Sequence, residues 1–90
     1  MMKRYDVYVG GFDDNEAIDF NESYDFLEQA TEAMETLAEH YDFVDIWEKT
    51  SRPNGTAYSN VVAYYRTDTI KDPDGTVYKW NDNGMYYEEV

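Results

Sequence analysis

Apolar and polar side chains alternate in several stretches of the sequence, which is the pattern of strands that bury one face. The first stretch covers residues 4–9, where Tyr5, Val7 and Val9 fall on one side. Further expected strands cover residues 43–50, 58–67, 76–80 and 85–89, and the second of these is rich in Val and Tyr. The segments Pro53-Asn54-Gly55, Asp72-Pro73-Asp74-Gly75 and Asn83-Gly84 separate the later stretches and predict tight turns.

A helical repeat replaces this alternation over residues 24–41. At about 100° per residue, the apolar side chains fall on one side of the helical wheel: Phe26, Ala30, Ala33, Met34, Leu37 and Tyr41. Ser23 is expected to cap the helix, and Asp25 suits the positive end of its dipole. We expect Ala30 and Leu37 to be buried and Glu32 to be exposed. The preceding residues, Ala17 to Phe20, fit either a short edge strand or a loop.

Together these elements predict an α+β fold, in which one amphipathic helix packs on an antiparallel sheet of about four to five strands. The hydrophobic content of 42% and the aromatic content of 18% exclude a disordered acidic chain. With 90 residues and no linker or internal repeat, the chain is expected to form one domain over residues 1–90.

The net charge of −13 narrows the classes of partner. Residues 1–48 contain 14 Asp or Glu and two Lys or Arg, whereas residues 49–90 contain six and five. Such a field repels nucleic acid and anionic membranes and attracts basic proteins, so we expect neither direct nucleic-acid binding nor membrane binding. The chain has no cysteine and no apolar run of the length of a membrane span or signal peptide, and a cytoplasmic location is therefore expected.

Candidate catalytic and metal-binding groups are sparse. His40 is the only histidine, and its place at the helix end favours a solvated residue over a general base. A calcium loop with Gly75 at its sixth position would put Ile70 first and Asn81 twelfth, and neither supplies the required carboxylate. We expect no enzyme activity, no cofactor and no metal site.

The acidic residues of the helix have a pattern of their own. On the helical wheel Asp25, Glu28, Glu32, Glu35 and Glu39 fall within one sector, opposite the apolar side. Over a rise of about 21 Å they present roughly one carboxylate per 5 Å, a density comparable to the phosphates of one DNA strand, which repeat about every 3.4 Å. No Lys or Arg lies between Asp13 and Glu48 to offset them.

In size, composition and layout, this short, acidic, cysteine-free chain resembles the small phage-encoded inhibitors of host defence. That group includes anti-CRISPR and anti-restriction proteins, and several of its members mimic nucleic acid. The resemblance spans the whole chain but includes no specific motif, so it assigns no residue roles.

We therefore expect a stoichiometric inhibitor that occupies a basic, nucleic-acid-binding surface of a protein partner, such as a host defence nuclease. Its binding residues are expected to be the helix carboxylates and the acidic residues before them: Asp25, Glu28, Glu32, Glu35 and Glu39, extended by Asp13, Asp14, Glu16, Asp19 and Glu22. The alternative is an acidic accessory or structural phage-type protein whose charge serves solubility without mimicry.

Overall fold

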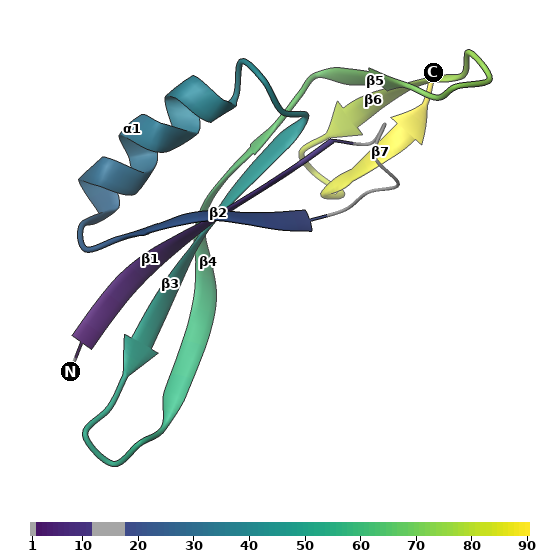
Figure 1. The fold of residues 1–90 in the computed structure, drawn as a ribbon. Helices are drawn as coiled ribbons and strands as arrows, with labels where there is room; N and C mark the ends of the chain where they lie inside the picture. The colour runs from purple at the N-terminus through teal and green to yellow at the C-terminus, as the bar shows by residue number, and fades with distance from the viewer. Residues whose placement is uncertain (1, 12–17) are drawn as a thin grey trace.

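A four-stranded antiparallel sheet forms the centre of the protein. The computed structural model describes residues 2–11 and 18–90. The strands are β1 (Met2–Gly10), β2 (Ile18–Tyr24), β3 (Phe43–Ser51) and β4 (Ala57–Arg66), in the spatial order β2-β1-β3-β4. A single described helix, α1 (Leu27–Leu37), packs on one face of this sheet (Figure 1). The α+β class predicted from the sequence is confirmed.

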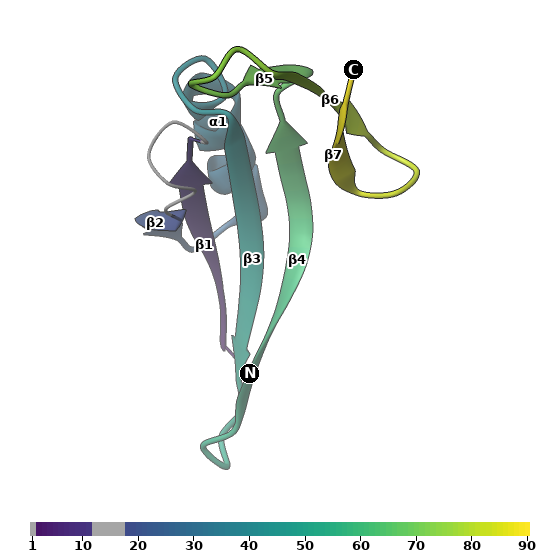
Figure 2. The same ribbon diagram turned by 90° about the vertical axis from the view of Figure 1, so that its right-hand side faces the viewer.

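The C-terminal strands form a second, smaller sheet rather than extending the first. It consists of β5 (Thr69–Lys71), β6 (Val77–Asn81) and β7 (Tyr86–Glu89), in that spatial order. Figure 2 shows it beside the C-terminal end of β4. The three-residue strand β5 was not expected, because so short an apolar alternation gives no sequence signal.

The predicted turns fall between these strands. In the first, the backbone N–H of Arg52 donates to the carbonyl of Thr56 at 2.8 Å, and Gly55 has a φ of 90°. In the second, Asp72 and Thr76 make the equivalent bond at 2.8 Å, and Gly75 has a φ of 94°. In the third, the positive φ lies at Met85 instead of at the Asn-Gly pair.

The hydrophobic core lies between α1 and the middle of the large sheet. Its buried members are Val7, Val9, Ala30, Val44 and Ile46. The strand residues come from alternate positions of β1 and β3, since successive side chains of a strand point to opposite faces. Ala30 is fully buried, as the helical periodicity predicted, and its small side chain lets the helix approach the sheet closely.

The helix is shorter than its apolar repeat indicates. Ser23 belongs to β2, where its hydroxyl donates to Asp6 Oδ1 at 2.6 Å, so the prediction that it caps the helix is wrong. The strand continues to Tyr24, which pairs with Tyr5 of β1, and these ladder bonds keep the chain extended. Phe26 occupies the N-cap position and is 66% exposed, whereas the sequence placed it on the apolar side.

Beyond Leu37 the chain forms a turn instead of continuing the helix. The N–H groups of Glu39 and His40 donate to carbonyls three residues back, at 3.2 and 3.0 Å. Leu37 is only partly buried, less than expected, because it lies at this end of the helix. The open question over residues 17–20 is answered from Ile18 onward, where β2 is an edge strand. Ala17 lies outside the described residues.

Arg66, at the end of β4, links the two sheets. Its Nη1 donates to Asp45 Oδ1 at 2.7 Å and to its neighbour's carbonyl, that of Tyr65, at 2.8 Å. The guanidinium carbon also lies 5.3 Å from the ring centroid of Phe43 and 5.6 Å from that of Trp80. Since Phe43 and Asp45 belong to β3 and Trp80 belongs to β6, one side chain bridges both sheets.

Tyr87 of β7 makes a second link. Its hydroxyl donates to the carbonyl of Thr67 at 2.7 Å, and its ring packs edge-on against Trp80, with 5.0 Å between centroids. Burial raises the pKa of Tyr87 to about 12, against the opposing effect of the nearby Arg66 cation. The folded state therefore favours the protonated phenol.

The burial of the core predicts unequal effects of two truncations. Ile46→Ala should lower the free energy of unfolding by about 2–5 kcal/mol, because Ile46 is fully buried on the central strand. Phe26→Ala should cost less than about 0.5 kcal/mol, because the ring is mostly exposed. Urea unfolding followed by circular dichroism measures both. A larger cost for Phe26→Ala would mean that the ring is packed.

The raised pKa of Tyr87 predicts a loss of stability in alkali. Relative to an unfolded pKa of 10.0, the stabilising contribution is complete below pH 10 and is lost as pH rises towards about 12. The free energy of unfolding, measured from pH 9 to pH 12, should therefore fall less steeply with pH in Tyr87→Phe than in the unaltered chain. Tyr86→Phe, which alters an exposed neighbour, is the control and should keep the original slope. Equal slopes in all three proteins would contradict the assignment.

Candidate functional site

The helix carboxylates form one exposed surface, here called the acidic face. It consists of Asp25, Glu28, Glu32, Glu35 and Glu39, all of which are exposed as the sequence predicted. Three of them lie within α1, Asp25 precedes its first turn and Glu39 lies in the turn that follows. The face is directed away from the sheet, because Ala30 and Met34 occupy the opposite side of the helix.

No ion pair in the described part of the chain involves these five carboxylates. The three that are present all connect strand residues: Lys3 with Glu48, Arg4 with Asp6, and Arg66 with Asp45. The three paired cations thus bind carboxylates of the sheet, while the helix carboxylates face solvent. Glu28 and Glu32, like Glu35 and Glu39, are four residues apart, a spacing at which like charges repel.

Two further predicted residues extend the acidic face across the edge strand. Asp19 and Glu22 of β2 are exposed, and they pair with Val9 and Val7 of β1. Because those two valines face the helix, the register puts Asp19 and Glu22 on the same side of the sheet as α1. Asp13, Asp14 and Glu16 lie outside the described residues, so their place relative to the acidic face stays a prediction.

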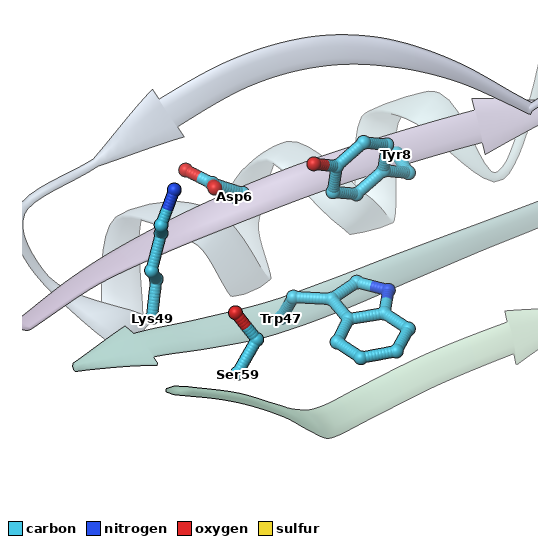
Figure 3. Close-up of a pocket in the computed structure, with 5 residues that line it drawn as sticks. All are labelled: Asp6, Tyr8, Trp47, Lys49 and Ser59. Atoms are coloured by element: carbon cyan, nitrogen blue, oxygen red, sulfur yellow. The ribbon is translucent and has the colours of Figure 1, made fainter. Parts of the chain in front are cut away.

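A second candidate site lies on the opposite face of the large sheet, and the sequence reasoning missed it. It is a depression of about 340 Å³, here called the sheet pocket, lined by Asp6, Tyr8, Trp47, Lys49 and Ser59 (Figure 3). The lining residues come from three different strands, β1, β3 and β4. The alternation of side chains within each strand places these residues on the face opposite the core. Only the register between the strands brings them together in one pocket.

The one histidine of the sequence belongs to neither site. His40 is exposed in the turn after α1. The described residues contain no group of three or more His, Asp or Glu side chains arranged to hold a metal ion. Within that same part of the chain, no helix has the length and apolar character needed to cross a bilayer.

No family model, no curated protein and no solved structure matches this chain. The function must therefore be inferred from the acidic face and the sheet pocket themselves.

The repulsion within the acidic face predicts that a single charge reversal will stabilise the protein. Glu32→Lys replaces the like-charge pair with Glu28 by an attractive one at the favourable spacing, and adds another with Glu35. We expect a gain of about 0.5 kcal/mol in the free energy of unfolding at low salt, and a smaller gain in 1 M NaCl. Thermal unfolding at both salt concentrations checks this. A loss of stability at low salt would show that Glu32 makes a favourable contact.

Proposed function

We propose that the protein is a stoichiometric inhibitor that binds, through its acidic face, to a basic nucleic-acid-binding surface of another protein. The observation that supports this most is the exposed, unpaired row of carboxylates from Asp25 to Glu39. A host defence nuclease is the kind of partner that the resemblance to phage-encoded inhibitors implies. The site of action is then cytoplasmic.

The acidic face has the physical requirements of a phosphate substitute. Three of its five carboxylates lie on the outer side of α1, where a rise of 1.5 Å per residue gives a regular spacing, and the other two lie just before and just after the helix. A surface that binds DNA presents Lys and Arg to one phosphate about every 3.4 Å per strand. Carboxylates in a row of similar density make charge-assisted hydrogen bonds with the same cations. Asp19 and Glu22 widen the row into a patch on one side of the molecule.

The distribution of charge favours binding over solubility as the role of the acidic face. Charge that serves only solubility can be spread over the whole surface, with both signs interspersed. Here residues 49–90 are nearly balanced, and the excess is concentrated in residues 1–48. The repulsion along the helix destabilises the fold slightly. A binding role would account for this repulsion, because the same clustered charges attract a basic partner through their summed field.

The test compares two triple variants with the same net charge. Reversal of Glu28, Glu32 and Glu35 to Lys changes the net charge by six, from −13 to −7. Reversal of Asp68, Glu88 and Glu89 to Lys has the same effect on net charge, but it alters exposed residues at and near the second sheet. Each protein is immobilised and exposed to a bacterial lysate, and the proteins that added duplex DNA displaces are identified and quantified by mass spectrometry.

The unaltered protein and the second-sheet variant should both retain DNA-displaceable, nucleic-acid-binding proteins. The helix variant should retain at least tenfold less of them, although its circular dichroism spectrum is unchanged. Equal losses in the two variants would mean that net charge alone attracts the partner. Full retention by the helix variant would show that the acidic face is not the binding surface.

A further inference from the structure

The sheet pocket has an aromatic end and a polar end. Figure 3 shows the rings of Tyr8 and Trp47 at one end, and the side chains of Lys49, Asp6 and Ser59 at the other. Tyr8 is held from outside the pocket by Phe20 of β2, with 5.7 Å between ring centroids and an interplanar angle of 69°. The depression of about 340 Å³ falls at the lower end of the range for small-molecule sites.

The carboxylate in the pocket is already compensated. Asp6 is 6% exposed, and its Oδ1 accepts hydrogen bonds from Arg4 Nε at 3.0 Å and from Ser23 Oγ at 2.6 Å. These two donors hold the side chain in place and match its charge. A cationic ligand therefore gains little from Asp6, because Arg4 already occupies the position that such a ligand would take.

Lys49 is the charged group of the pocket that has no ion-pair partner among the described residues. It is partly buried, and it lacks such a partner although the full sequence has 20 acidic residues and seven Lys and Arg. The register pairs it with Arg4 on one side and Ser59 on the other, so its neighbours across the strands are a cation and a hydroxyl. Because Arg4 is already paired with Asp6, the pocket keeps one unpaired positive charge, on Lys49, beside the hydroxyl of Ser59.

A second hollow continues the positive end of the pocket. It measures about 230 Å³, and Lys49 lines both hollows. Lys3 and Arg4 also line it, with Asp25 at one side. Lys49 is therefore shared between the two hollows, whereas Lys3 and Arg4 are already paired with Glu48 and Asp6.

We propose that the sheet pocket binds a small planar aromatic anion, that is, a ring bearing one phosphate or carboxylate group. The ring packs against Tyr8 and Trp47, and the anionic group accepts hydrogen bonds from Lys49 and Ser59. Aromatic rings favour offset or edge-to-face packing with such a ring, and a charge-assisted hydrogen bond fixes its orientation. This activity is independent of the acidic face, which lies on the other side of the sheet.

The overall negative charge does not prevent this binding. At physiological ionic strength the field of exposed charges is screened over about 8 Å. None of the five acidic-face carboxylates lines the sheet pocket itself, and Asp25 is the one that lines the neighbouring hollow. A single small anion also interacts only with the nearby cations, because it is too short to reach the acidic face. A long polyanion would instead extend past the pocket towards the acidic residues, so the proposed ligand is a small molecule rather than a nucleic acid.

An NMR titration of the complete chain tests the proposal with an internal control. The protein has two tryptophans, so its indole N–H groups give two signals, from Trp47 in the pocket and from Trp80 in the second sheet. The probes are adenosine monophosphate and phenylacetate, which carry a ring with phosphate or carboxylate. Adenosine and inorganic phosphate each carry one half of the proposed ligand.

The Trp47 signal should move saturably with at least one of the two aromatic anions, and the one that binds more tightly identifies the anionic group. Adenosine and inorganic phosphate should each bind at least tenfold more weakly. Lys49→Gln should weaken binding about tenfold, and Lys79→Gln, an exposed change on β6, should leave it unchanged. Amide spectra of both variants establish that the fold is retained.

Three results would overturn the proposal. The first is the absence of a saturable Trp47 shift with either aromatic anion. The second is equally tight binding of adenosine, which would remove the role of Lys49. The third is an equal shift of the Trp80 signal, which would place the ligand elsewhere.

Discussion

The alternation of side chains along β3 is the constraint on which the rest of the structure depends. β3 is hydrogen-bonded to β1 on one side and to β4 on the other, so its register fixes both neighbours. Val44 and Ile46 point to the helix and form the centre of the core. Asp45, Trp47 and Lys49 point the other way, where they anchor Arg66 and line the sheet pocket. A shift of one residue would exchange these two sets and expose the core.

The second sheet is held to the first by a few specific side chains. Arg66 pairs with Asp45 and lies among aromatic rings of both sheets, and Tyr87 donates to the backbone just beyond β4. The guanidinium suits this place because it donates in a plane and packs on aromatic faces at the same time. These contacts keep the second sheet at one end of β4, so the rest of the open face, including the pocket, stays uncovered.

Local patterns predicted most of the secondary structure, and the misses came from interactions between distant residues. Alternation found the long strands, and Gly55 and Gly75 occupy turns as expected. The helix start was misplaced because Ser23, a good capping residue in isolation, bonds instead to Asp6 of a neighbouring strand. The packing of the second sheet against the first involves Arg66 of β4 and Trp80 of β6, which come from separate elements of the chain. No local pattern contains that pairing.

The two candidate sites also differ in whether a local sequence pattern could predict them. The acidic face was predicted because its members follow a helical periodicity that can be read directly from the sequence, although only Glu28, Glu32 and Glu35 lie within α1. The sheet pocket was missed because Asp6, Trp47 and Ser59 belong to three strands, and only the register places them side by side. The sheet therefore separates a surface rich in unpaired carboxylates from a small aromatic hollow with an unpaired lysine.

We propose that this protein binds basic partners through the acidic face in particular and not through its net charge in general. Amide chemical-shift mapping during titration with an oligoarginine peptide tests it most directly. Binding through the acidic face would place the largest shifts on residues 25–39 and on β2, with small shifts on β5, β6 and β7. Shifts of similar size over the whole surface, or largest on the second sheet, would contradict it.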